Sequence, residues 1–126
     1  MRNILYTLIL FIAIVLIAIS YQIHITNLSD NINSISEKII TSISNKDYTS
    51  SEVYMNELEK LWKKNIKILM FFQDHASVNE AEVFINLAAN GLKNKEFNQV
   101  SDNLISFTCI LDELASENKP TLENIL

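Results

Sequence analysis

The most constraining feature of the sequence is an uncharged apolar stretch near its beginning. No side chain in residues 4–25 carries a charge, and nearly every residue of 4–19 is apolar. A helix needs about 20 such residues to cross a hydrocarbon core about 30 Å thick, because each residue adds about 1.5 Å. The sequence therefore predicts a transmembrane helix in contact with membrane lipid, and we assign residues 1–26 to a membrane anchor.

The residues that flank this stretch predict its orientation. Tyr6 near one end, and Tyr21 with His24 near the other, suit the two membrane interfaces, where a ring keeps its polar edge in water. Arg2 and the amino terminus are the only positive charges close to the first end, and the next charged residue is Asp30. The positive-inside rule then predicts a single-pass protein of the cell membrane, with a cytoplasmic N-terminus and an extracytoplasmic C-terminal part.

A cleaved signal peptide is the alternative interpretation of the same stretch. Ala18-Ile19-Ser20 offers small residues of the kind that a signal peptidase selects. The apolar stretch is longer than the core of a usual signal peptide and continues through Ile23 and Ile25, which favours a retained anchor. Both interpretations export residues 27–126.

Composition predicts the structure of the exported part. The chain holds one Gly and one Pro, where average usage would give about nine and about six. Tight hairpins and phosphate-binding loops depend on Gly, so an all-β fold and a Gly-rich nucleotide site are poorly supported. Nine of the ten basic residues lie beyond Arg2, against fifteen acidic ones, which argues against nucleic acid and against anionic lipid as the main partner of this part.

Hydrophobic periodicity predicts that the first helix continues to about Asn45. Its apolar residues recur at steps of three and four as in a coiled coil: Ile25, Leu28, Ile32, Ile35, Ile39 and Ile43. We expect this narrow isoleucine seam to be offered to a neighbouring molecule, which makes Ile32 and Ile35 candidate partner-binding residues.

Three further helices are predicted. The second, over about 51–74, has one broad apolar face around Trp62 and a cluster of lysines opposite, which we interpret as a solvated face. A capping box at Ser77-Val78-Asn79-Glu80 predicts the start of the third, and Gly91 suits its end. The fourth covers about 95–117, before Pro120. Short connections make consecutive helices antiparallel, so we expect an all-α, up-down helical bundle over 27–126, with the apolar tail at 121–126 docked on it.

The sequence offers little for catalysis. His24 and His75 are the only imidazoles, no nucleophile or phosphate-loop motif occurs, and the single Cys109 cannot form an internal disulfide. We therefore predict neither an enzyme nor a cofactor. His75 lies beside Asp74 between the second and third helices, so a metal site can be drawn there. A hydrogen bond from His75 to the last carbonyls of the second helix is the interpretation we favour.

Several features together resemble a known family of short membrane proteins of unknown function from Gram-positive, often spore-forming, bacteria. They are the N-terminal apolar helix, Trp62 followed by Lys63-Lys64, His75 at a helix turn, the helix at 97–111, and the closing Leu122-Glu123-Asn124-Ile125-Leu126. The resemblance implies no activity, substrate or cofactor.

The functional expectation is a membrane-anchored, non-catalytic interaction module of the cell envelope. Its partner would be another envelope protein or a second copy of the chain, contacted through Trp62, His75, Ile32 and Ile35. A tryptophan in the middle of an apolar helical stripe is more often a core residue, so we also expect the indole N–H of Trp62 to find a hydrogen bond at the bundle edge. The alternative function is an extracytoplasmic metal-binding or small-ligand-binding domain centred on His75.

Overall fold

The chain folds into four helices. A computed structural model describes residues 1–117, and these contain α1 (Arg2–Ser44), α2 (Tyr48–Phe72), α3 (His75–Lys93) and α4 (Phe97–Glu117), with no strand among them. The predicted all-α class is therefore confirmed. The expected docking of the tail at 121–126 lies outside the described residues.

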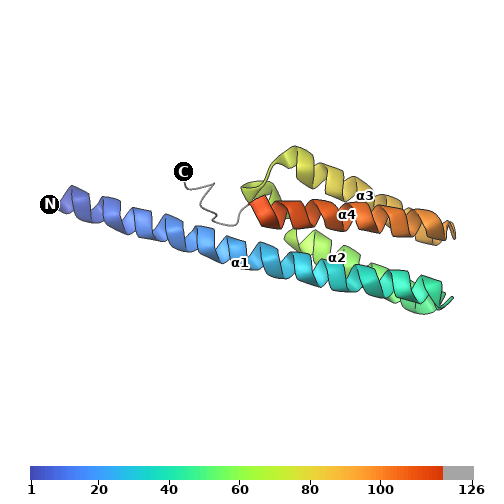
Figure 1. The fold of residues 1–126 in the computed structure, drawn as a ribbon. Helices are drawn as coiled ribbons and strands as arrows, with labels where there is room; N and C mark the ends of the chain where they lie inside the picture. Colours follow the sequence, from blue (N-terminus) through green and yellow to red (C-terminus); the bar gives the residue numbers. More distant parts are fainter. Residues whose placement is uncertain (118–126) are drawn as a thin grey trace.

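The helices lie side by side, and the chain reverses direction at each connection (Figure 1). α1 packs against α2 and α4, while α3 packs against the same two helices, so α1 and α3 occupy opposite corners of the bundle. α1 is much longer than its neighbours, and its N-terminal part extends beyond the other helices (Figure 1). We call residues 2–20, every one of which is exposed, the exposed segment.

The remaining part of α1 is covered by the chain's own helices. The isoleucine seam forms the α1 side of the core: Tyr21, Ile25, Leu28, Ile32, Ile35 and Ile39 are all buried. This corrects the expectation that the seam is offered to another molecule. A heptad-like spacing shows that a stripe is covered, but it does not distinguish a partner chain from the helices that follow in the same chain.

The centre of the core is aromatic. Trp62 on α2 and Phe107 on α4 meet edge to face, with ring centroids 5.2 Å apart, a preferred arrangement because the positive edge of one ring faces the negative face of the other. Leu58, Leu104 and Leu111 are fully buried in the same core. Trp62 is thus a core residue, but its indole Nε1 is buried without a hydrogen-bond partner, contrary to the expected bond at the bundle edge.

The turns between α1 and α2 and between α3 and α4 are two copies of one structure. Their sequences are Asn45-Lys46-Asp47-Tyr48 and Asn94-Lys95-Glu96-Phe97. Both lysines adopt the left-handed conformation, with φ of 59° at Lys46 and 60° at Lys95. The backbone bonds also correspond, because the N–H of Asp47 donates to Ser42 O and that of Glu96 to Gly91 O, each at 2.8 Å.

The equivalence extends along both helix pairs. We call residues 21–72 the first hairpin and 75–117 the second hairpin. With the offset that takes Asn45 to Asn94, most buried positions of one hairpin fall on buried positions of the other. The pairs include Ile32 with Ala81, Ile39 with Ala88, Ser51 with Val100, Met55 with Leu104 and Leu58 with Phe107. Tyr48 and its counterpart Phe97 stack on each other at 4.4 Å with planes 4° apart. A residue that contacts its own counterpart marks a two-fold axis, so the two hairpins pack with approximate two-fold symmetry.

Three predicted boundaries need correction. α2 begins at Tyr48 rather than near residue 51, because Asp47 caps it by accepting a hydrogen bond from the Ser50 N–H. α3 begins at His75 rather than after Ser77, because Asp74 is the capping residue and Ser77 donates its hydroxyl to that carboxylate.

The third correction concerns Gly91, which does not end α3. It has an ordinary helical conformation, and the left-handed residue that follows the helix is Lys95. A Cβ at residue 91 would stand 3.1 Å from Val100 Cγ2, so the missing side chain lets α3 and α4 approach closely beside the turn.

Candidate functional site

The exposed segment is the largest apolar surface of the described chain. Between residues 4 and 19 the aliphatic and aromatic side chains are exposed by 38% to 74% of their area. α1 is the one helix of the described residues that is long and apolar enough to cross a membrane, judged by length and composition. A folded monomer in water rarely leaves a continuous apolar patch larger than a few hundred Å² uncovered, so this surface needs a covering.

The end of α2 is joined to α1 at the point where the exposed segment ends. The rings of Tyr21 and Phe72 stack with centroids 4.3 Å apart, and the Tyr21 hydroxyl accepts a hydrogen bond of 2.6 Å from Gln73 Nε2. One turn along α1, His24 Nε2 donates to Asn65 Oδ1 at 2.7 Å. We call these five residues the α1–α2 joint. Because two side-chain hydrogen bonds and one ring stack join α1 to the end of α2, the joint fixes the end of α2 against α1.

An apolar groove of about 380 Å³ runs along this joint. It is lined from both helices by Leu16, Ile17, Ser20, Tyr21, His24, Ile68 and Phe72. Leu16 and Ile17 belong to the exposed segment, whereas Ile68 and Phe72 come from the end of α2. The groove therefore continues the apolar surface of the exposed segment onto the bundle.

α1 and α4 are joined by a separate polar cluster. Asp112 Oδ1 accepts hydrogen bonds from the Ser29 hydroxyl at 2.6 Å and from Asn33 Nδ2 at 2.8 Å. Nearer the exposed segment, Gln22 Nε2 donates to the carbonyl of Ala115 at 3.1 Å. These bonds hold the end of α4 on α1, so the ends of both α2 and α4 are fixed relative to α1.

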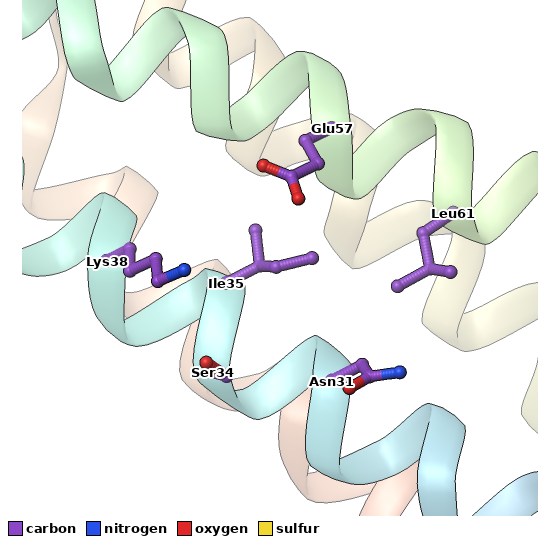
Figure 2. Close-up of a pocket in the computed structure, with 6 residues that line it drawn as sticks. All are labelled: Asn31, Ser34, Ile35, Lys38, Glu57 and Leu61. Atoms are coloured by element: carbon purple, nitrogen blue, oxygen red, sulfur yellow. The ribbon is translucent and has the colours of Figure 1, made fainter.

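A second groove lies between α1 and α2, with a volume of about 360 Å³ (Figure 2). Its walls are Asn31, Ser34, Ile35, Lys38, Glu57 and Leu61. Ile35 points from α1 toward α2 and forms the floor between Lys38 and Leu61 (Figure 2). The Lys38 ammonium lies 5.7 Å from the centre of the Tyr54 ring, close enough for a cation–π contact. The groove combines one acid, one base and two neutral polar groups without a nucleophile–base pair.

The four candidate partner-binding residues occupy different environments. Ile32 is fully buried and Ile35 retains 7% of its surface, so both contribute mainly to the core. Trp62 is buried beside Phe107. Only His75 is exposed, and its Nε2 donates to the carbonyl of Met70 at 2.8 Å. The structure does not bring these four residues together into one site.

The bond from His75 is the helix-end contact that the sequence suggested as the alternative to a metal site. Asp74, its neighbour, caps α3 through its carboxylate. Within residues 1–117 no three His, Cys, Asp or Glu side chains gather into a group that could hold a metal ion. The alternative of a metal-binding domain centred on His75 therefore gains no support from the geometry.

Sequence reasoning missed the importance of the end of α2. The broad apolar face predicted around Trp62 includes Phe72, but Phe72 is 39% exposed and its neighbour Phe71 is 81% exposed. Successive helix positions differ by about 100°, so two adjacent phenylalanines point in different directions. The pair Phe71-Phe72 at a helix end was the signal that could have identified this surface.

Comparison with known families matches nearly the whole bundle. A family model described as a domain of unknown function, DUF4363, covers residues 19–125, so it includes the α1–α2 joint and begins near the end of the exposed segment. Comparisons with curated proteins and with solved structures give no match. The expected likeness to a family of unknown function is confirmed, and the chain belongs to the DUF4363 family.

Proposed function

We propose that the protein is a single-pass membrane protein whose helical bundle is a non-catalytic interaction module outside the cytoplasm. Residues 1–26 contain the anchor, and residues 27–126 belong to the exported domain. The last residues of 1–26 also contribute Tyr21 and Ile25 to the core of the bundle. The observation that carries the proposal is the exposed segment, which is apolar on all sides, uncharged beyond Arg2 and continuous with the buried half of α1. A helix that is hydrophobic all round is stable when lipid covers it.

The two halves of α1 support this assignment by their difference. None of residues 2–20 is buried. The half of α1 that follows has one buried stripe, and its opposite face is polar. The bundle therefore has its own core without the exposed segment, which leaves the segment free to enter a bilayer. Arg2 at its start favours a cytoplasmic N-terminus.

The state of the polar side chains supports a non-catalytic role. Both imidazoles donate a hydrogen bond within the protein, His24 to Asn65 and His75 to Met70. General-base catalysis requires an imidazole within hydrogen-bond reach of a substrate or nucleophile. The interaction we propose is with an envelope protein or a second copy of the chain, through the outer surface of the bundle.

The anchor and its orientation are tested in membranes from cells that express the full chain with a C-terminal reporter. We expect the protein to resist extraction at alkaline pH and mass spectrometry to detect its uncleaved N-terminal segment. We also expect protease added outside intact cells to remove the reporter. Release at alkaline pH with a shortened N-terminus would establish a cleaved signal peptide instead. A reporter protected from external protease would overturn the orientation.

The interaction role is tested through Cys109, the single cysteine, which is exposed on α4. A thiol-linked photo-crosslinker at Cys109 in intact membranes is expected to give a covalent adduct with one envelope protein or with a second copy. The Cys109→Ser variant controls for labelling elsewhere. If only the monomer is recovered from this position and from a second label on α3 at Val83, which is also exposed, the interaction role is wrong.

A further inference from the structure

The end of α2 carries an apolar surface that the bundle does not cover. Phe71 is 81% exposed, Ile68 45% and Phe72 39%. The two phenylalanine rings contact each other edge to face at 4.9 Å, so they form one aromatic cluster. Burying apolar surface is favourable, so an exposed aromatic cluster gains stability from any apolar surroundings that cover it.

The depth of this cluster relative to the proposed membrane span follows from α1. A span of about 20 residues that begins at residue 4 ends near Ile23. Tyr21 lies within the last turn of that span, and Phe72 stacks directly on its ring. Since α1 is one uninterrupted helix, the stack places Phe72, and Phe71 next to it, at the level where the hydrocarbon core meets the headgroups.

The groove at the α1–α2 joint connects the two surfaces. Leu16 and Ile17, which belong to the span, form one wall, and Ile68 with Phe72 forms the other. Lipid that covers Leu16 and Ile17 therefore also reaches the end of α2. No additional partner is needed to cover the aromatic cluster.

The polar groups nearby are compatible with a headgroup layer. Lys67 is exposed and stands one helical turn before Phe71, on the same face of α2 and about 6 Å farther along the helix. That height corresponds to the headgroup region, which adds about 5–8 Å on each side of the hydrocarbon core. The nearest acid of the turn, Asp74, directs its carboxylate to Ala76 N–H and the Ser77 hydroxyl of its own helix.

We propose that the end of α2 is a second membrane contact, in which Phe71 inserts into the interfacial layer of the bilayer that α1 spans and Lys67 lies at the lipid phosphates. This inference rests on the proposed membrane anchor. The bundle then rests on the bilayer at two points, α1 and the end of α2, and cannot swing freely about the point where α1 leaves the membrane.

The test measures the depth of spin labels in the full chain. Cys109 is replaced by Ser, and single cysteines are introduced as Phe71→Cys, Phe11→Cys and Val53→Cys in three separate proteins. All three positions are exposed, so labelling leaves the core intact, and Val53 lies on α2 toward the opposite end. Each labelled protein is reconstituted into vesicles of phosphatidylcholine with phosphatidylglycerol, and collision rates with oxygen and with a water-soluble nickel chelate are measured.

We expect the label at residue 11 to show high oxygen and low nickel accessibility and the label at residue 53 to show the reverse. The label at residue 71 is expected to give an intermediate ratio that places it at the edge of the hydrocarbon core. A label at residue 71 that resembles the one at residue 53, while residue 11 is in the bilayer, overturns the second contact and leaves the anchor intact. Nickel accessibility at residue 11 itself overturns the anchor. Adding Lys67→Glu is expected to move the label at residue 71 outward, and an unchanged depth would exclude a role for Lys67.

Discussion

The two hairpins share one backbone plan and fill it with different side chains. Where the first hairpin has Ile32 and Ile39, the second has Ala81 and Ala88, and where the first has Ser51 the second has Val100. A large residue in one hairpin therefore often corresponds to a small one in the other. Protein cores are close-packed, so large residues of one hairpin can compensate for small residues of the other. The two hairpins thus share buried positions and not the identity of the residues at them.

The contacts between the hairpins are less symmetric than the hairpins themselves. The α1–α4 contact carries the bonds from Ser29 and Asn33 to Asp112 and from Gln22 to Ala115. Its symmetry counterpart is the α2–α3 contact, where the residue equivalent to Ser29 is Val78. The side-chain hydrogen bonds between the hairpins therefore lie along α1, the helix that also carries the exposed segment. These bonds hold α4 against the helix that contains the proposed anchor.

The largest expected effect comes from making the first hairpin resemble the second at a core position. Ile32→Ala removes a fully buried side chain and is expected to lower the free energy of unfolding by about 2–5 kcal/mol, the usual result of lost burial plus a cavity. The measurement is urea unfolding of the full chain in detergent micelles, followed by the fluorescence of Trp62, the single tryptophan.

Two variants control this experiment. Ile9→Ala makes the same chemical change in the exposed segment, where the side chain is 55% exposed, and is expected to leave the unfolding curve unchanged. Ala81→Ile makes the reciprocal change and is expected to cost about 1–3 kcal/mol through overpacking. Equal effects of Ile32→Ala and Ile9→Ala would contradict the division of α1 into a packed half and an exposed half.

The division of α1 also shows what the sequence could predict. The steps of three and four that end at Ile43 predicted which face of α1 is buried, because burial follows helical periodicity. They could not predict that α2 and α4 cover that face. The predicted ends of the helices were less accurate, because the left-handed turn residues are Lys46 and Lys95 rather than glycine.

The second prediction concerns the asymmetric fastening. Asp112→Ala removes the acceptor for the Ser29 hydroxyl, which is nearly buried, and is expected to cost about 1–2 kcal/mol because a buried donor loses its partner. Glu113→Ala changes the adjacent exposed acid and is expected to have no measurable effect in the same unfolding assay. The prediction fails if the two variants unfold at the same urea concentration.

The third prediction tests the close approach beside the second turn. Gly91→Ala gains helix propensity of up to about 1 kcal/mol, but its Cβ meets Val100 Cγ2 at 3.1 Å. The first hairpin avoids this conflict with Ser42 and Ser51 at the equivalent positions. In a double-mutant cycle, Gly91→Ala is therefore expected to be more favourable in a Val100→Ser background than in the wild type, by about 1 kcal/mol. Additive effects would show that Val100 does not limit this position.

The joint was harder to predict than the core, for a physical reason. His24 and Tyr21 were expected at a membrane interface because of their amphipathic rings, and their bonds to Asn65 and Gln73 depend on how α2 ends. Periodicity gives the face of a helix but not its register along a neighbour. The repeat of Asn-Lys-acid-aromatic at the two turns was visible in the sequence. A four-residue repeat does not by itself predict a shared structure, which became evident because both copies adopt the same conformation.

The smallest expected effect distinguishes the two turns by their acids. Asp47 accepts hydrogen bonds from the hydroxyl and, with a smaller effect, from the backbone N–H of Ser50, and these bonds lower the pKa of its carboxyl below the ordinary value. A lowered pKa means that the folded state favours the charged form, so the stabilisation is present above the ordinary pKa and is lost as pH falls through the lowered one. Asp47→Ala is therefore expected to lower the midpoint of thermal unfolding slightly at neutral pH, and the difference from the wild type is expected to shrink below about pH 4.

Glu96→Ala, at the equivalent position of the second turn, serves as the matched comparison, since the Gln99 and Val100 N–H groups donate to the Glu96 backbone carbonyl and not to its side chain. A pH-independent difference for Asp47→Ala would show that the carboxylate charge does not contribute to capping α2.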